Sequence, residues 1–177
     1  IGGKQDPIPT IPQFRFYHTK CRSDPSVRYQ KLLQLKNILV TGAGGQIGSW
    51  LVPKLRGLYG NSRVIATDIR QLDPEMAESG LFELLDATDS EALGEVVESH
   101  QVGLIYHLAA VLSATGERDP RRAWHVNMSS LEAVLEVARH QGCAVFTPSS
   151  IGVFGSGTPK DLTPQDTVMQ PTTMYGI

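Results

Sequence analysis

Ser150 and Tyr175 are the side chains whose types and spacing best suit proton transfer during the oxidation of an alcohol. A phenol can act as the general base that removes an alcohol proton while hydride leaves for a nicotinamide ring. A nearby cation must then lower the phenol pKa from about 10. A serine hydroxyl can orient the same alcohol, and Ser149 offers a second hydroxyl beside the first. An isolated tyrosine more often packs or faces solvent, so this interpretation depends on a nucleotide site elsewhere in the chain.

A glycine-rich turn in the first third of the chain predicts that nucleotide site. Gly42, Gly45 and Gly48 follow the short apolar run 37–40 and precede an amphipathic segment. Glycines let the backbone turn sharply and approach a pyrophosphate, while the next helix directs free N–H groups and its positive dipole end at the phosphates. Asp68 follows Gly48 by 20 residues, at the end of the next expected strand. A carboxylate there can accept hydrogen bonds from the ribose hydroxyls, which favours NAD over NADP.

Arg70 is the residue that complicates this choice of cofactor. An arginine just past the second strand can also accommodate a 2′-phosphate. Asp68 would repel that phosphate, so we expect NAD. The predicted cofactor site also includes Gln46 and Ile47 in the glycine turn and Ile69 beside Asp68.

The residues that follow the later strands are further candidates, because ligands of doubly wound sheets bind beyond the carboxyl ends of the strands. Asp86 and Ala87 follow the third expected strand. There the carboxylate would either accept from an adenine amino group or cap a helix. Leu108, Ala109 and Ala110 follow the fourth. Their small side chains would either let the dinucleotide lie against the backbone or only pack.

Strand-like and helix-like patterns alternate from residue 37 onward, which is typical of an α/β fold with a doubly wound parallel sheet, the Rossmann arrangement. The expected strands are 37–41, 63–67, 82–85, 104–108 and 144–147. Five strands fall short of the six or seven of such a sheet, so we expect it to be incomplete at the C-terminus and the chain to be cut short.

Two of the expected helices carry specific signals. Pro53 lies inside the helix after the glycine turn and predicts a kink or an early end. The longest helix is expected to begin with Asp119 as N-cap and Pro120 as its first residue, and to end before Gly142. Its apolar residues recur at spacings of three and four, at Trp124, Met128, Leu131, Leu135 and Ala138.

The composition excludes several classes of function. Of the 177 residues, 19% are charged and the net charge is −2, so we expect no nucleic-acid partner. No apolar run reaches the roughly 18 residues that span a bilayer, so we expect no membrane partner. Cys21 and Cys143 belong to no ligand pattern and read as free thiols in a reducing compartment. The five histidines show no metal-ligand spacing, so we expect no metal.

The segment 1–36 differs from the domain 37–177 that follows it. Prolines break its periodicity, and basic residues outnumber acidic ones. The segment is therefore either the remnant of a mitochondrial transit peptide or a flexible tail. We expect a mitochondrial location on the first interpretation and a cytoplasmic one otherwise.

These motifs resemble those of the extended short-chain dehydrogenase/reductase family, which includes nucleotide-sugar epimerases and dehydratases. The family turn TGxxGxxG matches residues 41–48, and its serine and Tyr-x-x-x-Lys pair matches Ser150 and Tyr175. Within the family, the chain is most similar to the branch of short-chain L-threonine 3-dehydrogenases. The similar segments are 67–70, 107–117, 148–155 and 174–177. The resemblance covers about residues 37–177.

The resemblance implies NAD-dependent oxidation of the L-threonine β-hydroxyl to 2-amino-3-oxobutyrate. Tyr175 would be the base and Ser150 the orienting hydroxyl, with Ser149 less favoured. Ser113 would face the substrate. Asn127 would stand behind the catalytic group in a proton relay at the cofactor site; its alternative is a polar residue that faces solvent. Family members usually form homodimers through the long helix, here 120–140.

The resemblance also leaves alternatives of function. A nucleotide-sugar epimerase or dehydratase would share the sheet and the Ser/Tyr pair, because the fold alone does not set the substrate. A catalytically inactive NAD-binding fragment is the third alternative. The family lysine, which binds the nicotinamide ribose and lowers the tyrosine pKa, would fall at position 179, beyond Ile177. We therefore expect the chain as it stands to turn over slowly or not at all.

Overall fold

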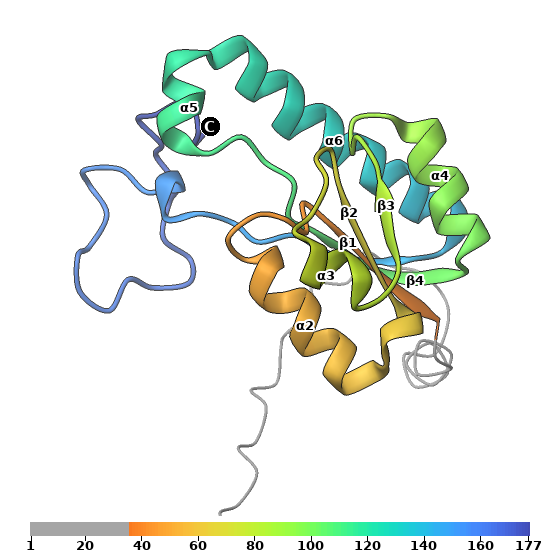
Figure 1. Ribbon diagram of the computed structural model, residues 1–177. Coiled ribbons are helices and arrows are strands. Elements are labelled where there is room, and N and C mark those ends of the chain that lie inside the picture. The colour runs from red at the N-terminus through yellow and green to blue at the C-terminus, as the bar shows by residue number, and fades with distance from the viewer. Residues whose placement is uncertain (1–35) are drawn as a thin grey trace, which may run out of the picture.

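The computed structural model describes residues 36–177, which form a five-stranded parallel sheet between helices (Figure 1). The strands are β1 (Asn37–Thr41), β2 (Val64–Asp68), β3 (Phe82–Leu84), β4 (Val102–His107) and β5 (Ala144–Phe146). Their order is β3-β2-β1-β4-β5, so the chain winds in opposite directions from the central pair β1 and β4. The predicted α/β class and doubly wound parallel sheet are confirmed. Each predicted strand is present: β1 has the predicted bounds, and the ends of the other four differ from the prediction by at most two residues.

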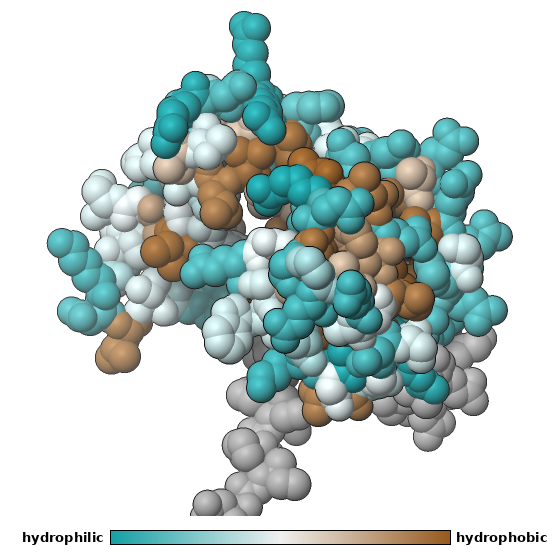
Figure 2. All heavy atoms as spheres, in the orientation of Figure 1, coloured by the Kyte–Doolittle hydropathy of each residue, from teal (hydrophilic) through white to brown (hydrophobic). Residues whose placement is uncertain are grey.

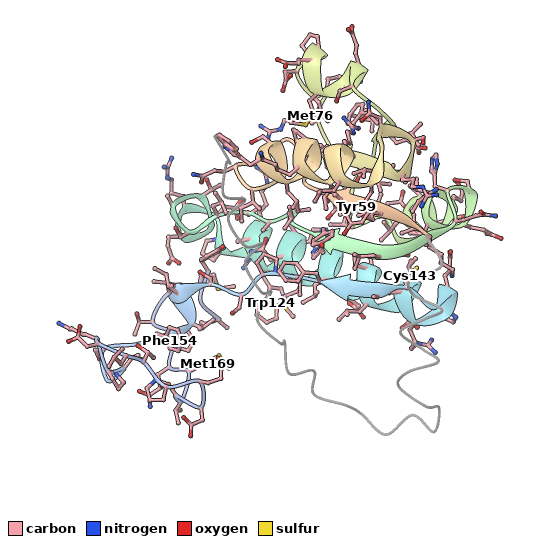
Figure 3. All side chains as sticks on the ribbon, turned by 90° about the horizontal axis from the view of Figure 1, so that it is seen from below. Tyr59, Met76, Trp124, Cys143, Phe154 and Met169 are labelled. Atoms are coloured by element: carbon pink, nitrogen blue, oxygen red, sulfur yellow. The ribbon has the colours of Figure 1, made fainter. Side chains whose placement is uncertain are left out.

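The helices cover the two faces of the sheet separately. One face carries α2 (Gly48–Tyr59) and α3 (Pro74–Glu78), and the other carries α4 (Ser90–Ser99) and α6 (Pro120–Gln141). Figure 3 shows Met76 beside α2 and Trp124 on α6, on opposite sides of the sheet. The short helix α5 (Ser113–Arg118) packs on α6, and two 3₁₀ turns cover Asn61–Arg63 and Ile151–Val153.

The alternation of side chains along each strand builds two cores. Leu39, Ile65 and Ile105 are fully buried in the core that includes α4 and α6. Val40 and Val64 are fully buried in the core that includes α2. Strands that bury both faces read as nearly continuous apolar runs, which is the pattern of a parallel sheet. This core holds the carboxyl ends of the strands in fixed positions at one edge.

The predicted early end of the helix at Pro53 is wrong. The helix α2 continues past Pro53 to Tyr59. A proline inside a helix costs about 3 kcal/mol through its missing donor and its ring. Val52 and Leu55, on either side of the proline, are buried against the sheet, and their burial offsets that cost.

The predicted limits of the longest helix are confirmed. Asp119 is the N-cap of α6 and its carboxylate accepts from the backbone N–H of Arg122 at 3.1 Å. Pro120 is the first residue, and Gly142 ends the helix in the left-handed conformation with φ +70°. Both ends follow the chemistry of helix caps, in which a carboxylate satisfies free N–H groups and glycine adopts positive φ without strain.

The apolar residues predicted along α6 divide between two faces of the helix. Ala138 is buried with Ala133, Val134 and Val137 against the sheet. In contrast, Trp124, Met128 and Leu135 are 50%, 43% and 50% exposed. Figure 2 shows hydrophobic side chains along the course of this helix, bordered by hydrophilic ones. The helix therefore presents an apolar stripe to the outside as well as an apolar face to the core.

The described part of the chain leaves some expectations untested. Residues 1–35, with the transit-peptide interpretation and Cys21, lie outside it. Within residues 36–177, no helix combines the length and apolarity needed to cross a bilayer. The same residues hold no group of three or more side chains arranged to bind a metal ion.

Candidate functional site

The glycine turn crosses the carboxyl end of the sheet between β1 and β4, where the direction of winding reverses. Gly42 has φ +68°, and a Cβ there would lie 2.6 Å from the backbone nitrogen of Ala109. A Cβ on Gly48 would lie 2.5 Å from the carbonyl oxygens of Gly42 and Ala43. Gly45 donates its N–H to the Gly42 carbonyl at 3.0 Å. Two positions of this turn thus require glycine, and a crevice at such a switch point is where doubly wound sheets bind ligands.

Asp68 ties the end of β2 to this turn. One carboxylate oxygen accepts from the Gly44 N–H at 3.0 Å, and the other accepts from the Arg70 N–H at 3.1 Å. The Arg70 guanidinium lies 3.8 Å from the Asp68 carboxylate. Its side chain is 78% exposed, whereas the side chain of Asp68 is 8% exposed. The sequence prediction missed Gly44, although it is one of four glycines in the turn. Each carboxylate oxygen retains a lone pair for a ribose hydroxyl.

The other residues predicted around the cofactor lie at the rim of this region. Ile47 and Ile69 are 57% and 58% exposed, and Gln46 is exposed beside Ile47. Ala109 is half-buried and Ala110 is exposed, whereas Ala87 is buried. Their contact with a cofactor stays a prediction.

Asp86 stabilises the turn that follows β3 and is not the N-cap of α4. Its carboxylate accepts from the backbone N–H and the hydroxyl of Thr88 at 2.9 and 2.8 Å. Asp89 is the N-cap of α4 and accepts from the N–H groups of Glu91 and Ala92. The helix-capping interpretation of Asp86 is therefore wrong, and its contact with adenine stays a prediction.

Asn127 holds the loop that follows β4. Its Oδ1 accepts from the Val111 N–H at 2.7 Å, and its Nδ2 donates to the Val111 carbonyl at 3.1 Å. The side chain is half-buried, so it is not the solvent-facing residue of the alternative interpretation. The same loop is joined to β1, because Leu108 donates its N–H to the Thr41 carbonyl at 3.1 Å. The proton relay through Asn127 stays a prediction.

His107 is the centre of a buried polar network that the sequence analysis missed. Its Nδ1 lies 2.9 Å from the Thr41 hydroxyl and its Nε2 lies 3.3 Å from the Ser130 hydroxyl. The residue is 5% exposed, and burial lowers the imidazole pKa to about 4. The neutral ring thus joins the ends of β1 and β4 to α6 directly behind the glycine turn. The sequence signal that could have revealed this network is a histidine, His107, at the end of the apolar strand β4.

This network predicts a pH dependence of stability. The folded-state pKa lies below the ordinary 6.5, so between about pH 6.5 and 4 the unfolded chain binds a proton that the folded chain does not. The stabilisation is present above pH 6.5 and falls by about 1.4 kcal/mol per pH unit below it. We expect the free energy of unfolding of the wild type, measured by urea denaturation, to fall between pH 7 and pH 5. This fall should be about 2 kcal/mol larger than the fall measured for His107→Gln. A His125→Gln variant, which removes an exposed histidine, should retain the wild-type loss. Equal losses in wild type and His107→Gln would contradict the prediction.

Ser150 and Tyr175 lie beside the same glycine. The Ser150 hydroxyl accepts from the Gly152 N–H at 3.1 Å. A Cβ on Gly152 would lie 3.4 Å from the Ser150 Oγ and 3.5 Å from the Tyr175 Cδ1. The two side chains predicted to do the chemistry are therefore brought together although 25 residues separate them. Ser149 is more exposed than Ser150.

Ser113 begins α5 and is exposed. Glu117 of the same helix accepts a hydrogen bond from the Tyr175 backbone N–H at 3.2 Å. Figure 1 shows the C-terminal end of the chain beside α5. The structure thus places α5, which carries the predicted substrate contact Ser113, beside the segment that carries the predicted base Tyr175. A hydroxyl and a phenol in this arrangement can orient an alcohol and remove its proton.

Comparison with known proteins identifies relatives over this part of the chain. Residues 38–177 match the NAD dependent epimerase/dehydratase family. An uncharacterized epimerase/dehydratase of Staphylococcus saprophyticus is 52% identical over 144 residues, which make up 81% of this chain and 45% of the relative. The chain therefore spans about half the length of the curated relatives it matches.

Solved structures share the fold and much of the sequence. An L-threonine dehydrogenase from Clostridium difficile superposes with a TM-score of 0.77 at 49% identity, over 80% of this chain and 45% of the other. A GalE-like L-threonine dehydrogenase from Cupriavidus necator, in its holo form, has a TM-score of 0.75 at 49% identity, over 79% and 46% of the two chains.

Proposed function

The chain belongs to the NAD dependent epimerase/dehydratase family, and we propose that the natural polypeptide that carries it oxidises L-threonine to 2-amino-3-oxobutyrate with NAD. The observation that carries the proposal is the pairing of Ser150 and Tyr175 around Gly152. Its support is 49% identity to a structure described as an L-threonine dehydrogenase.

The residues present fit a dinucleotide. The glycine turn lies so close to Ala109 that no side chain fits at Gly42. A turn built from glycines also has no side chains to keep a pyrophosphate from its backbone. Asp68 would accept from the ribose hydroxyls. Bound NAD would supply the hydride acceptor. The Ser150 hydroxyl would orient the threonine hydroxyl and the Tyr175 phenol oxygen would take its proton, as general acid–base catalysis requires.

The experiment is an absorbance assay for NADH formation from L-threonine and NAD, on the natural polypeptide that carries this sequence. We expect NADH to accumulate with L-threonine. A UDP-sugar that raises the melting temperature, where L-threonine gives no NADH, would favour the nucleotide-sugar alternative. Thermal stabilisation by NAD alone would favour the inactive NAD-binding alternative.

We also propose that two copies associate through the outer face of α6. Trp124 and Met128 lie about one turn apart along this face, Leu135 lies about two turns further on, and all three remain about half exposed. Met128, Leu131 and Leu135 line a shallow groove together with the charged residues Glu132, Glu136 and Arg139. An apolar stripe with a charged border along a 22-residue helix suits a second copy of the same helix.

A charge within this stripe should therefore separate the copies. Leu135→Glu buries a carboxylate at the contact, so we expect the dimer dissociation constant to rise roughly 100-fold or more. Light scattering after size-exclusion chromatography measures the change. Leu58→Glu is the matched control, because Leu58 is 76% exposed on α2. A wild-type protein that elutes as a monomer at all concentrations would contradict the proposal.

A further inference from the structure

The segment that carries Tyr175 has one hydrogen bond to the body of the domain. Within the described residues, the Tyr175 N–H donates to the Glu117 carboxylate at 3.2 Å across 58 residues. The other hydrogen bonds of residues 156–177 stay between positions 155 and 177. Figure 3 shows Met169 on this segment and Phe154 just before it, both away from the helices that cover the sheet. Among the described residues, the position of the phenol thus depends on this one hydrogen bond and on packing.

The backbone of the Tyr175 turn also packs against the backbone at Gly152. A Cβ on Gly176 would lie 2.1 Å from the Gly152 carbonyl oxygen, so the two backbones touch without side chains between them. The turn around Tyr175 is closed on itself, because Gly176 and Ile177 both donate to the Thr173 carbonyl. The packing of these two glycines sets how close the two backbone segments lie but supplies no directional bond. The hydrogen bond from the Tyr175 N–H to Glu117 is the directional contact that orients this turn.

Glu117 lies on a firmly supported helix. Gly116 of α5 is buried, and a Cβ on it would lie 3.3 Å from the Ala123 side chain of α6. Ser113 lies four residues before Glu117, and residues at this spacing share one face of a helix. The face that bears the predicted substrate contact therefore also bears the tether of the predicted base.

We propose that Glu117 is a positioning residue that holds the Tyr175 turn against α5, so that the phenol meets the alcohol oriented by Ser150 and faced by Ser113. The inference rests on the proposed function for its kinetic consequence. The carboxylate acts as a hydrogen-bond acceptor for a backbone amide and does not touch the reacting atoms. A side chain that keeps an acceptor at the same reach should therefore preserve the function.

The test compares Glu117→Ala with Glu117→Gln in the natural polypeptide. Glu117→Ala should lower kcat for L-threonine about 10- to 100-fold while the KM for NAD changes less than about twofold, because a displaced base loses alignment and the glycine turn is untouched. Glu117→Gln keeps an oxygen acceptor, so its kcat should stay within about threefold of wild type. Arg118→Ala, a neighbour on α5 with an exposed side chain, should behave as wild type.

Hydrogen exchange supplies a readout that does not depend on the substrate. The peptide that covers residues 171–177 should exchange faster in Glu117→Ala than in wild type, and Glu117→Gln and Arg118→Ala should leave its rate unchanged. Unchanged exchange or unchanged kcat in Glu117→Ala would overturn the inference. A wild-type protein that gives no NADH from L-threonine would overturn the proposed function instead, and the exchange rates would still decide whether Glu117 holds the Tyr175 turn.

Discussion

Replacing Tyr175 by phenylalanine is expected to lower kcat for L-threonine oxidation by about 1,000-fold, because the variant keeps the ring and loses the phenol oxygen proposed to take the alcohol proton. General acid–base catalysis contributes about 10²–10⁴ in rate. The ring contact with Gly152 involves Cδ1 and does not need the hydroxyl, so the fold should be retained. NAD should still raise the melting temperature as it does in wild type.

The matched control for this variant is Tyr59→Phe. Tyr59 lies at the end of α2 and is 48% exposed, so its hydroxyl has no part in the proposed chemistry. Stopped NADH formation in Tyr175→Phe with wild-type rates in Tyr59→Phe would assign the base. A Tyr175→Phe variant with wild-type kcat would contradict both the assignment and the proposed mechanism.

Gly42→Ala is expected to weaken NAD binding by about 100-fold or more and to lower the free energy of unfolding by about 2–4 kcal/mol. Gly42 has φ +68°, and its added Cβ would fall 2.6 Å from the backbone nitrogen of Ala109. Because the neighbouring atom is backbone, the turn or the end of β4 must move. Isothermal titration with NAD and urea denaturation measure the two effects.

Gly57→Ala makes the same chemical change where nothing opposes it. Gly57 is inside α2, and a Cβ there would meet no atom within 4 Å. Alanine should stabilise this helix by roughly 0.5–1 kcal/mol and leave NAD affinity unchanged. Equal NAD affinity in Gly42→Ala and Gly57→Ala would show that the glycine turn does not approach the cofactor.

The sheet and the glycine turn were predictable because their signals are local. Buried parallel strands read as short apolar runs, and the caps Asp119 and Gly142 mark the ends of α6 in the sequence itself. The pairing of Ser150 with Tyr175 was also expected, from the chemistry of the two side chains and from the resemblance to a family. Periodicity alone does not show that the 24 intervening residues fold back on themselves.

The contacts that the sequence analysis missed depend on tertiary structure. The bond between Glu117 and Tyr175 joins positions 58 residues apart, and the His107 network joins three elements. The partition of α6 into a buried and an exposed face depends on how the helix rotates on the sheet. Pro53 misled the prediction because its local cost is smaller than the gain from packing its neighbours.

The neutral ring of His107 gives this protein an internal spectroscopic probe. One of its two nitrogens carries a proton, which faces either the Thr41 or the Ser130 hydroxyl and lies away from water. Such a proton exchanges slowly and gives a separate downfield resonance in proton NMR spectra recorded in water. Its chemical shift follows events at the junction of β1, β4 and α6 without any label, at a position directly behind the glycine turn.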